Sequence, residues 1–262
     1  MGKISEDLRI YTEGNPENQA IIFIHGFPYD SSMWEQQIEA LKQTHYCISY
    51  DIRGLGKSAV GNGQFTMETF ADDVFAIIDD YKLERPVICG LSMGGYLSFR
   101  LLERDQNKFK AAIFCDTKPV ADNNAGKLKR CASIKKIETE GVEKFVKDFI
   151  PTCFSLGFMK REAVKFNYII EKAALASPLG VKGAQLAMLS RTDSVHFLPE
   201  IKIPVLVLSG EFDKMTSPED MRAIADQIPG AAFKVIPDAG HMTPIENPDA
   251  FNKAIISFLQ KI

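Results

Sequence analysis

The stretch that decides the fold is CGLSMGGY, residues 89–96, in which one serine stands among three glycines. The apolar run PVICG before it predicts a buried strand, and YLSFRLLER after it predicts a helix. A G-x-S-x-G sequence at such a junction makes a sharp turn, and Gly90 and Gly94 leave the backbone room to make it. We therefore expect a tight strand-to-helix turn that carries Ser92.

Ser92 is either a nucleophile or a capping residue in a glycine-rich turn. A serine at the start of a helix lies beside free N–H groups and a helix dipole, both of which favour a nearby negative charge. The strand before Ser92 and the helix after it are the setting that a nucleophile elbow requires. These flanks favour the nucleophile.

A nucleophilic serine needs a base. The chain offers four histidines, which are His25, His45, His196 and His241. On a turn of this kind the chain order is serine, acid, histidine, so the first two histidines are excluded. His196 lies in a helical region and is expected to be structural. His241 lies in the loop PDAGHMTPIENP after the last predicted strand, and we predict that it is the base.

The acid should follow a strand and precede His241 in the chain. Asp213 lies three residues beyond the predicted end of the strand IPVLVLSG, and we predict that it orients the imidazole. Glu211 is expected to support the same loop. Asp116, after the preceding strand, is an alternative acid, whereas Asp238 is close to the histidine along the chain and is expected to serve the turn.

Two backbone N–H groups are expected to form an oxyanion hole. One is the amide of Met93, the residue after the nucleophile, and the other comes from the loop after an early strand. The sequence HGFPYD supplies that loop, with the Phe27 amide as the donor and with His25 and Gly26 shaping the turn.

Apolar strand-like runs alternate with amphipathic helices along the rest of the chain. The runs span residues 20–26, 46–51, 86–92, 109–116, 203–210 and 231–238, and helices are predicted at 31–43, 66–83, 217–229 and 248–262. This alternation predicts an α/β fold with a doubly wound, mostly parallel sheet. Residues 1–117 and 201–262 form the expected core, and residues 118–200, which contain no convincing strand, are expected to form a helical lid.

Composition excludes several other classes of protein. The net charge of −3 over 262 residues argues against nucleic-acid binding, and the basic cluster within residues 127–136 fits the solvated face of a helix. The five cysteines include no CxxC pair, so we expect free thiols and no metal site. Without a signal peptide or a run long enough to cross a membrane, the chain is expected to be cytoplasmic.

Five motifs in this order resemble the α/β-hydrolase superfamily over nearly the whole chain. They are HGF (25–27), DIRGLGKS (51–58), GLSMGG (90–95), GEFD (210–213) and GHMTPIENP (240–248). They are most similar to the branch of small bacterial carboxylesterases, 3-oxoadipate enol-lactonases and cofactor-free haloperoxidases, although Leu55 replaces the usual histidine of the second motif. The resemblance implies an eight-stranded type of sheet, with the lid inserted before the strand ending near Gly210. It also implies a triad of Ser92, Asp213 and His241, working without metal or cofactor.

The substrate is expected to be a small, largely apolar ester or lactone. Five residues are candidates for its pocket, namely Trp34, Phe149, Phe154, Met188 and Met242. An enol-lactonase would need a cation to hold a free carboxylate, and three lid arginines, Arg130, Arg161 and Arg191, are available. Because nothing in the sequence directs them to the serine, we rank a carboxylesterase above an enol-lactonase or a perhydrolase. A hydrolase-fold ligand receptor with a slow triad is a further alternative. The expected assembly is a monomer or a homodimer.

Overall fold

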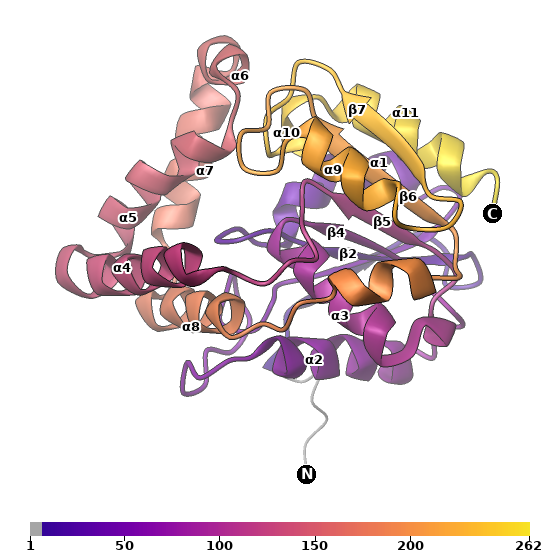
Figure 1. Ribbon diagram of the computed structural model, residues 1–262, viewed down its shortest axis with the longest axis horizontal. Coiled ribbons are helices and arrows are strands. Elements are labelled where there is room, and N and C mark those ends of the chain that lie inside the picture. Colours follow the sequence, from indigo (N-terminus) through magenta and orange to yellow (C-terminus); the bar gives the residue numbers. More distant parts are fainter. Residues whose placement is uncertain (1–6) are drawn as a thin grey trace.

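A computed structural model describes residues 7–262 as a single sheet with helices on both faces (Figure 1). The strands are β1 (Ile10–Glu13), β2 (Ala20–Ile24), β3 (Tyr46–Tyr50), β4 (Val87–Leu91), β5 (Ala112–Cys115), β6 (Val205–Gly210) and β7 (Ala232–Ile236). Their order in the sheet is β1-β3-β2-β4-β5-β6-β7. All neighbouring pairs are parallel except β1 with β3, so the predicted mostly parallel sheet is confirmed.

The sheet has seven strands within residues 7–262, one fewer than the eight-stranded type that the resemblance implies. The six parallel strands coincide with the six predicted apolar runs. The additional strand, β1, was not predicted because IYTE is short and half-exposed. Only six residues separate β1 from β2, so the chain has no room there for another strand.

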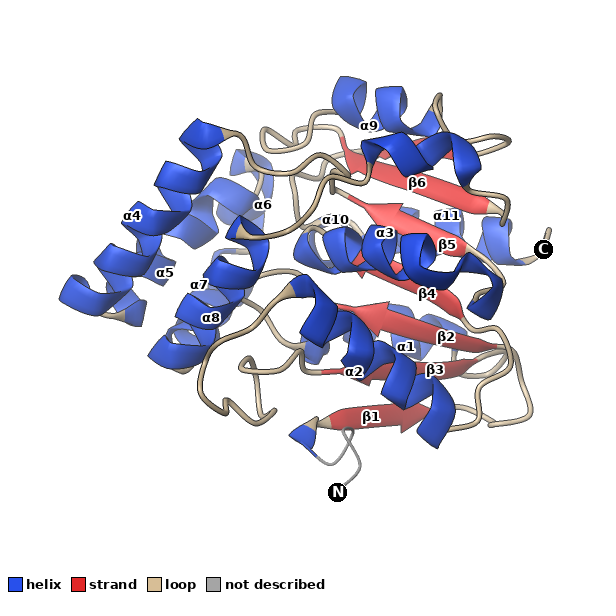
Figure 2. Ribbon diagram, turned by 60° about the horizontal axis from the view of Figure 1, so that its bottom comes forward, coloured by secondary structure: helices blue, strands red, loops and turns tan. Residues whose placement is uncertain are grey.

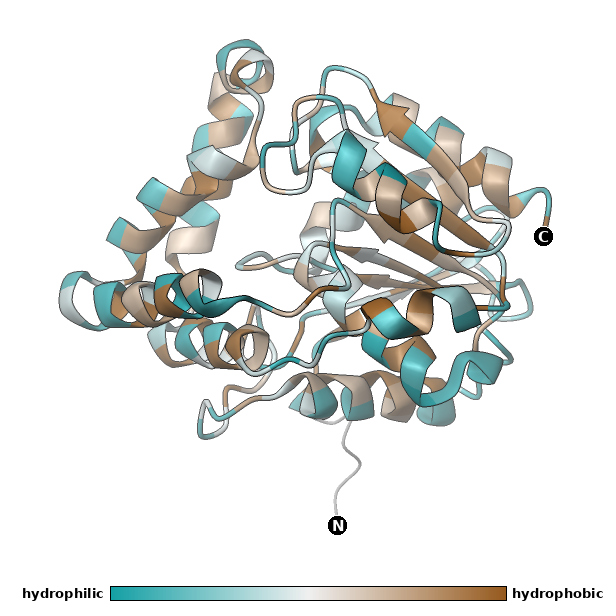
Figure 3. Cartoon of the chain, in the orientation of Figure 1, coloured by the Kyte–Doolittle hydropathy of each residue, from teal (hydrophilic) through white to brown (hydrophobic). Residues whose placement is uncertain are grey.

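Helices cover both faces of the sheet (Figure 2). The core helices are α1 (Glu35–Leu41), α2 (Met67–Asp80), α3 (Met93–Asp105), α9 (Pro218–Ala225), α10 (Thr243–Glu246) and α11 (Pro248–Leu259). α2 and α3 pack on one face, and α1 and α11 pack together on the other. Because both faces are covered, every residue of β2, β3, β4, β5 and β6 is buried, and these strands are apolar apart from Ser49 and Ser209 (Figure 3).

A helical insertion, residues 118–200, separates β5 from β6. It contains α4 (Asn124–Glu140), α5 (Val142–Phe149), α6 (Leu156–Arg161), α7 (Ala163–Ala174) and α8 (Pro178–Leu189). These helices stand beyond the carboxyl ends of the parallel strands (Figure 2). The last of them, α8, was not predicted, because its twelve residues, about three turns, are mostly small or apolar and show little contrast between faces. Ligands of open α/β sheets bind at this edge, so the insertion covers the expected site.

Smaller expectations have mixed outcomes. All five cysteines are free, and Cys47, Cys89 and Cys115 are buried as predicted. No helix within residues 7–262 is long and apolar enough to cross a membrane. The basic cluster of α4 is mostly exposed, but Arg130 is an exception, because its guanidinium pairs with the buried carboxylate of Asp122.

Candidate active site

Ser92 lies at the junction of β4 and α3 in a strained backbone conformation, with φ 54° and ψ −111°. Few residues other than glycine adopt a positive φ, and holding one there costs about 1–3 kcal/mol. The surrounding hydrogen bonds hold the turn in place. The Ser92 amide donates to the Cys115 carbonyl at 3.0 Å, and its own carbonyl accepts from the Thr117 hydroxyl at 2.7 Å and from the amides of Gly95 and Tyr96. The strand-to-helix turn predicted from the sequence is therefore present.

The glycines on either side of Ser92 are required by close packing. A Cβ added at Gly94 would lie 2.2 Å from the carbonyl oxygen of Ile24 on the neighbouring strand. A Cβ at Gly90 would lie 2.4 Å from the Gly94 carbonyl oxygen and 2.5 Å from the hydroxyl of Ser98. All three distances are shorter than the contacts that real Cβ atoms make, so α3 can approach the sheet this closely only with glycine at both positions.

We expect Gly94→Ala to lower the free energy of unfolding by about 3 kcal/mol, because the new methyl group meets backbone that cannot move aside. Urea denaturation of both proteins measures the change. Gly157→Ala is the matched control, since it is also a helical glycine but its Cβ would have no neighbour closer than 3.9 Å. There the better helix propensity of alanine should leave stability unchanged or raise it by up to about 1 kcal/mol. Equal losses in the two variants would contradict the packing argument.

Asp213 follows β6 and His241 follows β7, and the fold brings these two side chains together. Asp213 Oδ2 lies 2.8 Å from Nδ1 of His241, and both side chains are buried. The carboxylate also accepts from the Thr216 hydroxyl at 2.6 Å and from the amides of Met215 and Thr216 at 2.7 and 3.2 Å. Burial alone would raise the pKa of Asp213, but the imidazole and these donors hold it below its usual value. The carboxylate is thus kept ionised beside the imidazole.

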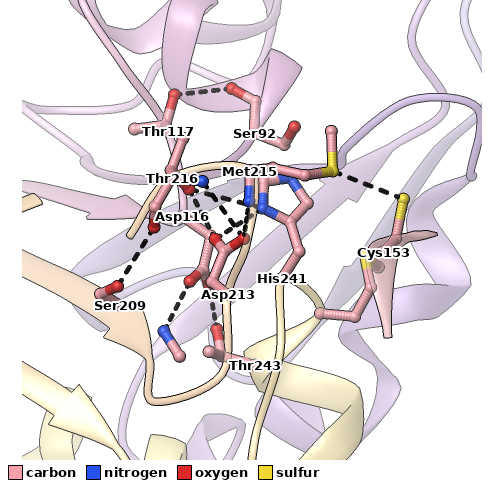
Figure 4. Close-up of polar contacts among 12 residues, drawn as sticks. Ser92, Asp116, Thr117, Cys153, Ser209, Asp213, Met215, Thr216, His241 and Thr243 are labelled. Atoms are coloured by element: carbon pink, nitrogen blue, oxygen red, sulfur yellow. Dashed lines mark hydrogen bonds and ion pairs between the residues drawn. The ribbon is translucent and has the colours of Figure 1, made fainter. Parts of the chain in front are cut away.

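The other nitrogen of His241, Nε2, is buried and has no hydrogen-bond partner among residues 7–262. Figure 4 shows the Ser92 side chain on this side of the imidazole ring. With Nδ1–H donated to Asp213, Nε2 carries the lone pair that a base needs. The three predicted triad residues therefore converge at the carboxyl ends of the strands.

The other acidic residues support the loops around the site, as expected for Glu211 and Asp238, whereas Asp116, the alternative acid, does not contact the imidazole. The Asp116 carboxylate accepts from the Gly210 amide at 2.7 Å and the Thr243 hydroxyl at 2.5 Å, so it holds β6 and α10 and does not contact His241. Burial and the nearby Asp213 raise its pKa well above the usual value. Glu211 accepts from the amide of Asp238, which lies in the turn before the histidine.

Two of the other three histidines make structural contacts. His196 is exposed and pairs with Glu103 at 3.2 Å. His25 is fully buried, and its Nε2 accepts from the Ile52 amide at 2.8 Å while Nδ1 lies 2.9 Å from the Gly26 carbonyl oxygen. Burial lowers the pKa of His25, which favours a neutral ring that fixes the loop at residues 25–30.

The two amides expected to hold an oxyanion are available at the turn. Met93 is the first residue of α3, where an amide has no acceptor within its own helix. Phe27 lies in the loop after β2, and its amide makes no hydrogen bond within the described chain. A Cβ at the intervening Gly26 would lie 2.8 Å from the Leu91 side chain, so this loop packs directly on the elbow.

A cleft of about 1020 Å³ opens beside His241 between the core and the helical insertion. Two of the predicted pocket residues, Phe149 and Phe154, line it. The other three do not. Trp34 is fully buried against Phe23 and Phe251 in the core. Met242 and Met188 are buried too, and the sulfur of the latter faces Arg130 at 3.2 Å. Proximity to a motif in sequence did not distinguish core from pocket for these three residues.

Several site residues carry no sequence signal of their own. Thr216 and Met215 bind the Asp213 carboxylate, and Thr117 binds the Ser92 carbonyl. Each lies within three residues of a predicted triad member or at the end of a predicted strand. These residues could therefore have been predicted from their positions along the chain, although not from their residue types.

Comparison with known proteins places the chain in a family. Residues 21–254 match the model of the alpha/beta hydrolase family, and the chain belongs to it. It is an enzyme of the α/β-hydrolase class. A curated relative, 3-oxoadipate enol-lactonase 1 of Acinetobacter baylyi, is 30% identical over 252 residues, covering 94% of this chain and 91% of that protein.

Solved structures agree with this assignment. A thermophilic esterase from Thermogutta terrifontis, solved with malate bound, has a TM-score of 0.93 and 34% identity and covers 97% of this chain and 93% of its own. The enol-lactonase from Burkholderia xenovorans LB400 has a TM-score of 0.90 and 30% identity, covering 97% and 96%. The chain is thus similar to both esterases and enol-lactonases.

Proposed function

We propose that this protein hydrolyses carboxylic esters through an acyl-enzyme on Ser92. The observation that carries the proposal is the buried Asp213–His241 pair, whose unpartnered Nε2 lies on the side of the strained Ser92. A protein that only binds ligands has no need of that strain or of an imidazole held in one tautomer.

The arrangement supports a two-step reaction. Nε2 of His241 takes the proton of the Ser92 hydroxyl as Oγ attacks the ester carbonyl, and the amides of Phe27 and Met93 stabilise the resulting oxyanion. The imidazolium then protonates the departing alcohol, leaving the acyl group on Ser92. Water, deprotonated by the same nitrogen, attacks the acyl-enzyme, and the imidazolium returns that proton to Ser92 Oγ as the bond to the acyl group breaks and the carboxylic acid leaves. Asp213 stabilises the imidazolium at each stage without itself taking the proton.

We propose that the helical insertion acts as a lid and that the cleft beside His241 takes the apolar part of the substrate. Its walls include Phe145, Phe149 and Phe154, and Met159 and Met215 add adaptable apolar surface. Such a lining suits short acyl chains or aryl alcohols.

A second candidate, an enol-lactonase or another enzyme for carboxylate-bearing esters, is favoured by a cationic cluster in the insertion. The Asp122 cluster consists of Asp122, Arg130, Arg191 and Lys118, three positive charges around one negative charge. It borders the elbow, because the Arg191 guanidinium lies 4.2 Å from the ring centroid of Tyr96, one helical turn after Ser92. The Thermogutta terrifontis esterase was solved with malate bound, and malate is a dicarboxylate, so a similar esterase can bind an anion.

The stability of this cluster should depend on pH in a defined window. Burial alone would raise the pKa of Asp122, but hydrogen bonds from Arg191 and Arg130 lower it to about 2 from 3.8. A lowered pKa in the folded state adds stability that is complete above 3.8 and is lost as pH falls toward 2. We therefore expect the difference in unfolding free energy between wild type and Asp122→Asn to shrink across this window. Urea titrations at successive pH values measure it, and a constant difference would contradict the assignment.

The proposed function is tested by mixing the protein with a fluorophosphonate and measuring intact mass, alongside turnover of p-nitrophenyl acetate and butyrate. A single adduct on Ser92 with steady turnover supports an esterase. A folded sample with neither adduct nor turnover supports the receptor alternative. Comparing p-nitrophenyl butyrate with the anionic hemisuccinate ester separates the two candidate enzymes, because the Asp122 cluster would raise kcat/KM for the anion.

A further inference from the structure

Glu246 is a buried carboxylate that the mechanism above does not use. It is the last residue of α10, five residues after His241, and only 4% of its surface is exposed. A carboxylate in such a place is costly unless hydrogen bonds replace the lost water. Its partners are therefore informative about its role.

Both oxygens of Glu246 accept hydrogen bonds from backbone amides on two different segments. Oε1 accepts from the amide of Met242 at 3.1 Å, and Oε2 accepts from the amide of Ser155 at 2.9 Å. Ser155 is the N-cap of α6 in the helical insertion. The amide of His241 itself donates to the carbonyl of Cys153 at 3.0 Å. Two hydrogen bonds thus join residues 241–246 to residues 153–155, and a third, from Met242, ties Glu246 to the residue after His241.

The packing at Gly240 shows how closely these segments meet. A Cβ at this position would lie 2.7 Å from the Ser155 nitrogen and 3.1 Å from Oε1 of Glu246. The residue before His241 therefore rests directly on the carboxylate and on the insertion. Displacing either would shift the backbone that aims the imidazole.

We propose that Glu246 is a positioning residue, which fixes the His241 loop against residues 153–155 of the insertion and whose charge favours the imidazolium formed during turnover. This inference rests on the proposed esterase function. The other titratable groups that the charge of Glu246 influences are Tyr29, Cys153 and Asp116, from the loop after β2, from the insertion and from the end of β5. None of these three groups can carry a positive charge.

Glu246→Gln tests both parts of the proposal. Both partners are N–H donors, so glutamine offers one acceptor and turns its NH₂ group toward the other. We expect kcat to fall about tenfold with little change in KM, as befits one lost hydrogen bond to a charged group. The acid-side midpoint of the kcat/KM–pH profile should move to lower pH, because the imidazolium loses a favourable charge. Glu246→Asp keeps the charge on a shorter side chain, and should lower kcat while leaving that midpoint in place.

Glu211→Gln is the matched control, since Glu211 also accepts from a backbone amide in a neighbouring loop but is exposed. Because Glu211 also contacts the turn before His241, a second control is Asp193→Asn, whose carboxylate accepts from the amides of Ala121 and Val195 and is exposed. Asp193→Asn should retain both the rate and the pH profile. An unchanged midpoint in Glu246→Gln, with kcat falling only in proportion to the fraction of molecules that a fluorophosphonate can label, would reduce Glu246 to a folding role and overturn the proposal.

Hydrogen–deuterium exchange separates this proposal from the proposed function. If Glu246 joins the two segments, Glu246→Gln should speed exchange in peptides from both the His241 loop and residues 153–155. Unchanged exchange in either segment would overturn the link even in an active esterase. If the wild-type protein has no esterase activity but Glu246→Gln still speeds exchange in both segments, the link stands and only the esterase function is rejected.

Discussion

Replacing Ser92 with alanine should lower kcat for p-nitrophenyl butyrate by about 10⁶-fold, to the background of the assay, because no other group replaces Oγ in forming the acyl-enzyme. The fold should survive. Alanine at the same φ of 54° bears the same backbone strain as serine, and the bonds that hold the turn use the Ser92 backbone. Steady-state rates, the acyl-enzyme burst and urea denaturation measure the two effects separately.

Ser190→Ala serves as the control for this variant. Ser190 is exposed in the helical insertion, and its hydroxyl donates to backbone carbonyls of α8. It should retain the wild-type rate and the fluorophosphonate adduct. Appreciable turnover by Ser92→Ala at wild-type stability would show that a different group is the nucleophile.

Asp213→Asn should lower kcat by about 10⁴-fold. The asparagine side chain has the same shape, but it can turn its NH₂ group toward His241 and so favour the tautomer with the proton on Nε2. A proton there blocks that nitrogen from accepting the Ser92 proton. Because Thr216 also holds the side chain at this position, the replacement of a carboxylate oxygen by NH₂ is the main change. Kinetics with p-nitrophenyl esters at neutral pH measure the loss.

Asp116→Asn distinguishes the chosen acid from its alternative. This carboxylate lies on the adjacent strand end and contacts Gly210 and Thr243 instead of the imidazole. We expect a kcat within about tenfold of wild type, since the change weakens a support and leaves the tautomer of His241 intact. A loss as large as that of Asp213→Asn would show that Asp213 was wrongly chosen over Asp116 as the acid.

Much of the fold could be predicted because buried parallel strands are apolar along their whole length. β2 and β4 are fully buried, and such runs stand out against amphipathic helices. The elbow was predictable for a different reason, which is that close packing leaves glycine as the only residue that fits at 90 and 94. Chain order then selected Asp213 and His241 from few candidates.

The parts that could not be predicted depend on tertiary contacts. Trp34 and Phe154 are both large aromatic residues near the site, yet one lies in the core and the other lines the cleft. Arg130 belongs to a basic run on α4, but the position of Asp122 turns it inward. Glu246 occupies an ordinary loop-to-helix position, and its importance depends on the distant Ser155 coming within hydrogen-bonding distance.

The order of strands across the sheet has a consequence for synthesis on the ribosome. β1 to β5 occupy adjacent places in the sheet and all lie before residue 116, so the elbow strand and both of its neighbours are made first. Asp213 and His241 follow β6 and β7, at the other edge. Because chains emerge from the N-terminus, a nascent chain would hold Ser92 in place long before any base could activate it. Reactivity would arise only when the last quarter of the polypeptide docks.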